Sequence, residues 1–128
     1  MAFLLDTHAF LWFASGDTQL PLSVRNKIKD LNQSCYLSIA SLWEITIKHQ
    51  IGKLTLNRTL EELFEFLIRN EIEIIDITLE HLLSLSKLPS VHSDPFDRLI
   101  ISQAISENLT IITRDKIFKK YKVKQQWS

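Results

Sequence analysis

Residues 92–104 read HSDPFDRLIISQA, a polar start followed by apolar residues at helical spacing. Pro95 suits the first turn of a helix, because the N–H group that proline lacks would be unpaired there. Asp94 then falls at the N-cap and Asp97 three residues later, where carboxylates meet free N–H groups and the positive end of the helix dipole. The pattern therefore predicts a helix that begins at Pro95 with acidic residues at its start.

Asp97 has a second interpretation besides helix capping. It is in line with Ile100, Ile101 and Ala104 at helical spacings, which places it at the edge of the buried face of the helix. A charge at that position is costly unless another group pairs with it. This stretch alone leaves both alternatives open, a cap and a functional carboxylate.

Length and composition indicate one domain over residues 1–128. The chain has 128 residues, 45% of them hydrophobic, and its mean hydropathy is close to zero. Cys35, the single cysteine, has no partner for an internal disulfide, which is typical of a reducing compartment. The N-terminus has no basic segment, and Asp6 and His8 interrupt its apolar run. We therefore expect no signal peptide, no membrane span and a cytoplasmic location.

Charge is balanced overall but uneven along the chain. Fifteen basic residues match fifteen acidic ones, so net charge gives no reason to expect nonspecific binding of nucleic acid. Within residues 114–124, however, a single acid accompanies a basic cluster: Arg114, Lys116, Lys119, Lys120, Lys122 and Lys124. This segment is either a solvated face or a surface that binds phosphate.

Apolar runs alternate with helical patterns along the whole chain. Strands are expected at residues 2–5, 35–39, 72–77 and 109–113, with an edge strand at 122–124. Helices are expected at 9–14, 22–31, from Ser41 to near Gly52, over 60–68, after Thr78, at 95–108 and at 117–121. Such alternation is typical of βαβ units, so we predict a three-layer α/β/α fold around a mainly parallel sheet of four to five strands.

Two segments match the capping-box pattern, in which a hydroxyl residue precedes a glutamate by three positions. Thr59 and Glu62 are fully explained as such a cap. Ser41 and Glu44 also fit it, but Glu44 shares a helix face with Ala40, Ile47 and Ile51 and so interrupts an apolar stripe. Glu44 therefore stays open between a cap and a functional acid.

Four acids are expected at one edge of the sheet. Asp6 and Asp115 follow apolar strands, whereas Glu44 and Asp97 lie near the starts of helices, and ligands of parallel sheets bind beyond the carboxyl ends of the strands. Four carboxylates in one place repel one another unless a cation is present. Oxygen ligands select hard cations, Mg²⁺ or Mn²⁺. The four histidines show no spacing typical of a zinc site.

The ordered set of short motifs resembles PIN-domain ribonucleases, of the kind that form the VapC-type toxin of VapBC toxin–antitoxin pairs. The motifs are Leu4-Leu5-Asp6-Thr7-His8, Ser41-Leu42-Trp43-Glu44-Ile45, Asp94-Pro95-Phe96-Asp97-Arg98 and Thr113-Arg114-Asp115, and they span nearly the whole chain. The resemblance implies that Asp6, Glu44, Asp97 and Asp115 bind Mg²⁺ or Mn²⁺ and catalyse hydrolysis of RNA phosphodiester bonds. Asp97 fits the family position better than Asp94, which stays an alternative, and Thr7 and Thr113 fall where the family often has a hydroxyl beside the acids.

The resemblance also implies partners for the chain. Lys116, Lys119 and Lys120 are expected to contact the RNA backbone, and Arg98 and Arg114 either contact phosphate or pair with neighbouring carboxylates. A homodimer and a small antitoxin are the expected protein partners. The apolar residues of 9–14, Trp43 and residues 64–68 are the expected contact surfaces, because one helical turn cannot bury four large side chains.

Two alternatives from other classes stay open. In a non-catalytic interaction module, the four acids are caps and surface residues. In a phosphoacceptor receiver domain, an acid pair follows the first strand and a lysine follows a late one, whereas this chain has Asp6-Thr7-His8 and Thr113-Arg114-Asp115.

Overall fold

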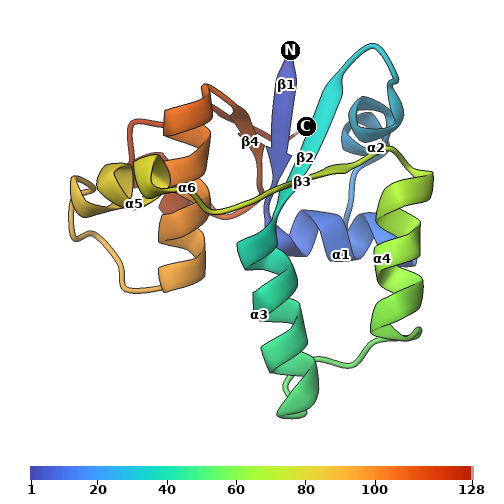
Figure 1. The fold of residues 1–128 in the computed structure, drawn as a ribbon. Coiled ribbons are helices and arrows are strands. Elements are labelled where there is room, and N and C mark those ends of the chain that lie inside the picture. The colour runs from blue at the N-terminus through green and yellow to red at the C-terminus, as the bar shows by residue number, and fades with distance from the viewer. Residues whose placement is uncertain (128) are drawn as a thin grey trace.

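A parallel sheet lies at the centre of the computed structural model, which describes residues 1–127 (Figure 1). Its five strands run in the order β3 (Glu73–Ile75), β2 (Ser34–Ser38), β1 (Ala2–Leu5), β4 (Thr110–Ile112) and β5 (Gln125–Gln126). β1 is the middle strand, and its residues 3–5 are buried, as expected for a strand covered on both faces. The predicted parallel sheet is therefore confirmed.

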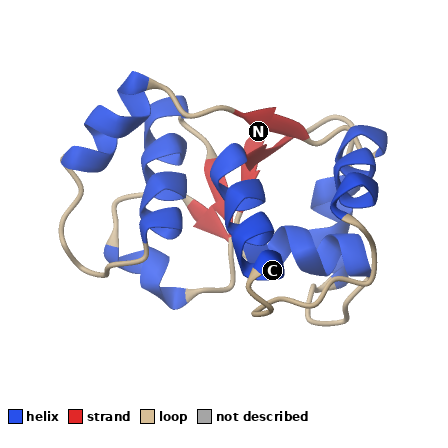
Figure 2. Cartoon of the chain, turned by 60° about the horizontal axis from the view of Figure 1, so that its bottom comes forward, coloured by secondary structure: helices blue, strands red, loops and turns tan. Residues whose placement is uncertain are grey.

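Helices cover both faces of the sheet, which gives the predicted three layers (Figure 2). On one face, Phe3 and Leu5 of β1 pack with apolar residues of α1 (Thr7–Ser15), α2 (Leu22–Lys29), α3 (Ile39–Gln50) and α4 (Leu60–Arg69). On the other face, Leu4 packs with α6 (Pro95–Glu107) and with the 3₁₀ helix η1 (Lys116–Lys120). The remaining helix, α5 (Leu79–Ser86), packs against α6.

The start of α3 differs from the prediction. Its N-cap is Ser38, whose hydroxyl accepts a hydrogen bond from the Ala40 N–H, so the helix begins at Ile39 and not at Ser41. The prediction of a capping box at Ser41 and Glu44 is therefore wrong. Both residues lie inside the helix and are buried. The capping box of Thr59 and Glu62 at the start of α4 is confirmed.

The start of α6 agrees with the prediction. Asp94 is the N-cap, and its Oδ1 accepts hydrogen bonds from the N–H groups of Phe96 and Asp97. The helix ends at Glu107, and its C-cap Asn108 has the left-handed conformation common at helix C-termini. Asp97 lies at the edge of the buried face, as its spacing predicted, with 22% of its side chain exposed.

Two other segments differ in detail from the sequence prediction. The edge strand lies at Gln125–Gln126, just after the expected residues 122–124, and pairs in parallel with Ile111 and Ile112 of β4. α1 begins at Thr7, with Asp6 as its N-cap, two residues before its expected start. Of its four large apolar residues, Phe10 and Phe13 are buried, whereas Leu11 and Trp12 are only partly covered.

No helix of the described residues is both long and apolar enough to cross a membrane.

Candidate functional site

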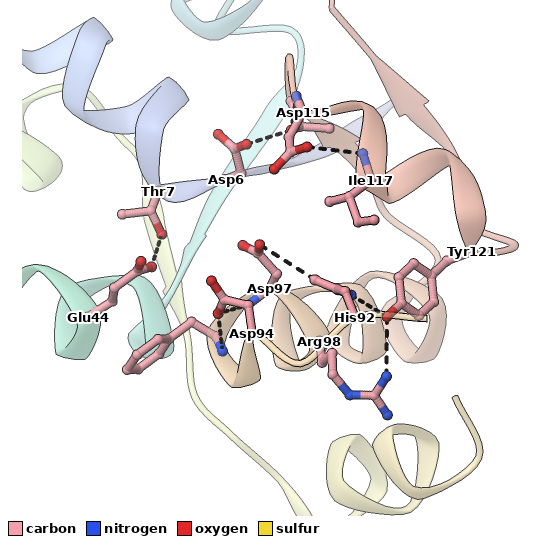
Figure 3. Close-up of polar contacts among 12 residues, drawn as sticks. Asp6, Thr7, Glu44, His92, Asp94, Asp97, Arg98, Asp115, Ile117 and Tyr121 are labelled. Atoms are coloured by element: carbon pink, nitrogen blue, oxygen red, sulfur yellow. Dashed lines mark hydrogen bonds and ion pairs between the residues drawn. The ribbon is translucent and has the colours of Figure 1, made fainter. Parts of the chain in front are cut away.

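The four acids singled out from the sequence lie at the carboxyl edge of the sheet (Figure 3). Leu5 of β1 is in register with Leu37 of β2 and Ile112 of β4, so the three strands end at one level. Asp6 follows β1 directly, Asp115 follows β4 by three residues, Glu44 lies in the helix after β2, and Asp97 lies in the first turn of α6. Topology thus brings together acids that are up to 109 positions apart in the sequence.

Asp6 is buried and held from two sides. Its Oδ1 accepts a hydrogen bond of 2.8 Å from the Ala9 N–H, and its Oδ2 accepts one of 2.5 Å from the Thr113 hydroxyl. Burial raises the pKa of Asp6 above its ordinary value, and these two hydrogen bonds oppose that rise. The Thr113 oxygen also accepts from the Asp115 N–H at 3.0 Å, so one hydroxyl fixes both acidic segments. Thr113 therefore lies beside the acids, where the resemblance placed it.

Glu44 is also buried, and both of its oxygens have partners. Oε1 accepts a hydrogen bond of 2.7 Å from the Thr7 hydroxyl, which also lies 3.0 Å from the Ser41 oxygen. Oε2 forms an ion pair of 2.6 Å with Lys48. This hydrogen bond is the main reason why the pKa of Lys48 is raised. Sequence analysis missed Lys48, although its spacing of four residues from Glu44 on a helix was a usable signal.

Asp97 lies close enough to the other acids for their negative charges to affect its pKa. Burial raises its pKa to about 7, and the charges of Asp94, Glu44, Asp6 and Asp115 add to the rise. The Nε2 atom of His92 lies 3.7 Å from Asp97 Oδ2. Asp94 itself is occupied in capping α6 through Oδ1.

The two arginines next to the acids do not pair with them. Arg98 points away from the carboxylates in Figure 3 and donates hydrogen bonds to the Pro89 carbonyl and the Tyr121 hydroxyl. Arg114 lies over the ring of Trp12, 4.4 Å from its centroid, and donates to Gln19. Within residues 1–127 neither arginine forms an ion pair, so the alternative of carboxylate pairing is wrong for both.

A hollow of about 240 Å³ opens beside the acids. It is lined by Asp6, His8, Trp12, Arg114 and Asp115. The basic segment begins at its rim, because η1 follows Asp115 directly and the side chains of Lys116, Lys119 and Lys120 are exposed. Acids, a stacked arginine–tryptophan pair and exposed lysines therefore lie next to one another.

Comparison with known proteins agrees with this arrangement. A family model described as the PIN domain matches residues 3–124. The chain belongs to the PIN domain family. No curated protein matches it in sequence.

Solved structures share the fold of this PIN domain. The VapBC2 complex of Rickettsia felis, bound to a DNA fragment from its promoter, contains a similar chain with a TM-score of 0.77 and 22% identity over 100% of both chains. VapBC-1 of nontypeable Haemophilus influenzae matches with a TM-score of 0.67 and 17% identity, over 98% of this chain and 97% of that one. A domain of a functionally unknown protein from Methanocaldococcus jannaschii matches with a TM-score of 0.57 and 16% identity, over 99% and 90%.

The acid set of this PIN domain fits a hard cation in its chemistry. Its donors are carboxylate oxygens, and the charges of the other acids add to the burial that raises the pKa of Asp97, so a cation there would balance part of this charge. In the part of the chain that the structure describes, no three carboxylate, imidazole or thiol groups already stand at the mutual spacing of ligands around one ion. Binding an ion would therefore draw the carboxylates closer together, with Lys48 releasing Glu44 if that residue is a ligand.

Proposed function

We propose that residues 1–128 of this PIN domain form a single nuclease domain, an Mg²⁺- or Mn²⁺-dependent endoribonuclease that is the toxin of a toxin–antitoxin pair. The observation that carries the proposal is the meeting of Asp6, Glu44, Asp97 and Asp115 at one edge of the sheet, where their charges help raise the pKa of Asp97. The similarity in fold to chains of two VapBC complexes supports the toxin assignment. We expect the protein to act in the cytoplasm, on RNA.

Each residue around the acids has a distinct role in this proposal. Asp6, Asp97 and Asp115, with Glu44, would hold the cation, and a cation bound there would supply a more acidic water and balance charge on the leaving 3′ oxygen. Thr113 fixes the orientation of Asp6, and Thr7 fixes that of Glu44. Lys48 balances the charge of Glu44. These contacts restrict the orientations of Asp6 and Glu44, which limits the reorganisation that binding of the cation would require.

The purified protein should cleave single-stranded RNA in the presence of Mg²⁺ or Mn²⁺, and EDTA should stop the reaction. Adding Mn²⁺ in excess over EDTA should restore cleavage, because the carboxylates survive chelation. Cleavage that continues in EDTA would contradict a metal-dependent mechanism. Complete inactivity together with no binding of Mn²⁺ would favour the alternative of a non-catalytic interaction module. Membership of the PIN family removes the support for a receiver domain.

Lys48 should compete with the cation for Glu44. Replacing Lys48 with methionine removes the ammonium that pairs with Glu44 while keeping an aliphatic side chain, so we expect Mn²⁺ affinity to rise roughly twofold to fivefold, as for a partly exposed ion pair. Isothermal titration measures this change. Lys53→Met, on the loop after α3, is the control and should leave affinity unchanged. Weaker binding by Lys48→Met would mean that the lysine supports the cation site.

The basic segment should bind the RNA backbone. Replacing Lys119 and Lys120 with alanine should weaken binding to all RNA sequences alike. The slope of log affinity against log salt should fall by roughly 0.7 for each phosphate of a single strand that the lysines no longer neutralise. The measurement is fluorescence anisotropy with labelled RNA at several salt concentrations, in EDTA to prevent cleavage. An unchanged slope would show that these exposed lysines form only a solvated face.

The surface beside the acids is suited to bind a small antitoxin protein. A cavity of about 380 Å³ is lined mainly by α1 and residues 54–58, and it shares His8 and Trp12 with the hollow at the acids. A helix of the antitoxin would cover the apolar side chains there, such as Leu11 and Leu54. An arginine from its tail would then reach the carboxylates and displace the cation.

A homodimer is the second proposed assembly, and α5 offers the surface for it. Leu79 and Leu83 lie one helical turn apart and are 80% and 62% exposed. Light scattering should therefore give a dimer mass for the parent and a monomer mass for Leu83→Glu. Leu31→Glu changes an exposed leucine outside α5 and should leave the dimer intact. A monomeric parent at high concentration would exclude the homodimer.

A further inference from the structure

Four side chains form a continuous chain of contacts that ends at the acid cluster. Arg98 Nη1 donates to the Pro89 carbonyl at 2.8 Å and to the Tyr121 hydroxyl at 3.2 Å. The Tyr121 hydroxyl lies 2.5 Å from His92 Nδ1. His92 Nε2, on the far side of the ring, faces Asp97 Oδ2 at 3.7 Å (Figure 3). Neither Tyr121 nor His92 was singled out from the sequence.

The direction of these hydrogen bonds fixes the tautomer of His92. An arginine only donates, so the Tyr121 oxygen accepts from Arg98 and its own hydrogen is free for His92. Among the described residues His92 Nδ1 is the acceptor within reach of this hydrogen, so Tyr121 donates to Nδ1, and Nδ1 is then the unprotonated nitrogen of the neutral ring. The remaining hydrogen of the imidazole lies on Nε2, the atom that faces Asp97.

His92 Nε2 is the end of this chain that lacks a partner. It is buried and has no hydrogen-bond partner among the described residues, although a buried N–H without one is costly. The Asp97 carboxylate is the acceptor that faces it, slightly beyond hydrogen-bond distance. Hydrogen bonds of this kind are often long in structures without ligands and shorten when the ligand is bound.

We propose that His92 is a positioning residue for Asp97. Its Nε2–H orients the Asp97 carboxylate toward the cation, and Tyr121 and Arg98 set the tautomer of the His92 ring. This inference goes beyond the proposed function and rests on it for the identity of the cation. It assigns Arg98 a task distinct from phosphate binding, because Pro89 and Tyr121 hold its guanidinium on the side of α6 away from the carboxylates. Partners of metal-ligating groups typically contribute 10–100-fold to metal affinity.

The tautomer is tested first, in the protein without metal. Nitrogen NMR of the imidazole at a pH where the ring is neutral should show a protonated Nε2 and an unprotonated Nδ1 for His92. Tyr121→Phe keeps the aromatic contact with His92 but removes the hydroxyl, so the two tautomers should become mixed. A proton on Nδ1 in the parent would overturn the proposal, because Tyr121 would then be the acceptor.

Mn²⁺ affinity, measured by isothermal titration, provides the second test. His92→Leu should weaken binding by roughly tenfold or more. His92→Gln should restore most of the affinity, because the glutamine amide offers a donor at the place of Nε2, and a purely structural role would not give this rescue. His49→Leu, at the exposed end of α3, should bind as the parent does.

The outcomes of these experiments separate the inference from the proposed function. Equal Mn²⁺ affinity for the parent, His92→Leu and His92→Gln, with all three folded by their melting curves, would overturn the inference and leave the proposed function standing. Absence of Mn²⁺ binding by the parent would overturn the proposed function and, with it, the role of His92 toward a cation.

Discussion

Replacing Asp6 with asparagine should reduce RNA cleavage by roughly a hundredfold or more while the protein stays folded. Asparagine keeps the oxygen that caps α1 through the Ala9 N–H, and the Thr113 hydroxyl can turn to accept from the new amide. What the variant loses is a negative charge at the carboxyl end of the central strand. A cation held by fewer charges binds more weakly and is displaced from the scissile phosphate.

The matched control for Asp6→Asn is Asp30→Asn. Asp30 also accepts a backbone N–H two residues on, from Asn32, but it precedes β2 and so lies at the opposite edge of the sheet. Cleavage rates with a labelled RNA, at saturating Mg²⁺, compare the two variants with the parent. Equal activity of Asp6→Asn and the parent would contradict the assignment of Asp6 to the site.

Asp97→Asn should make the metal-free protein more stable and greatly reduce its stabilisation by Mn²⁺. The pKa of Asp97 is raised from 3.8 to about 7 in the folded chain, so the folded state binds its proton more tightly than the unfolded state does. Stability is therefore lost as the pH rises between these two values, and at pH 8 the parent carries the full cost of the buried, repelled charge. Asparagine removes this cost and should raise the melting temperature in EDTA.

Mn²⁺ should narrow the difference in stability between the two proteins. At a concentration one hundred times the dissociation constant, a bound ion stabilises the parent by about 2.7 kcal/mol, whereas Asp97→Asn should be stabilised much less. Asp94→Asn is the control, because asparagine also caps a helix and Asp94 is engaged in capping. Equal stabilisation of Asp97→Asn and the parent would show that Asp97 is no ligand, and an Asp94→Asn variant that Mn²⁺ fails to stabilise would give that role to Asp94.

The fold could be predicted from the sequence because the strands and helices of this chain have distinct local sequence patterns. Apolar runs such as residues 2–5 and capping residues such as Thr59 and Asp94 depend on near neighbours only. The errors arise where tertiary contacts decide. Ser41 has the spacing of a cap, but Ser38 at the end of β2 is the N-cap of α3. Ser41 therefore lies inside the helix, where its hydroxyl contacts Thr7.

The acids of the site could be predicted from the sequence for a similar reason, whereas the side chains that contact them could not. Parallel strands end at a common edge, so acids after strands and at helix starts converge regardless of details. Which side chain contacts which acid depends on rotamers and on segments distant in sequence. Tyr121 and His92 meet across 29 positions, and Arg114 turns to Trp12 instead of a carboxylate.

Anomalous scattering from crystals soaked in Mn²⁺ tests the central claim most directly, because it locates the ion without an assay of activity. We predict a manganese peak between Asp6, Asp97 and Asp115, with Glu44 at its side, and its absence in crystals of Asp97→Asn soaked in the same way. A parent structure with no peak at the carboxyl edge of the sheet, or with manganese bound only elsewhere, would contradict the claim that these acids form a cation site.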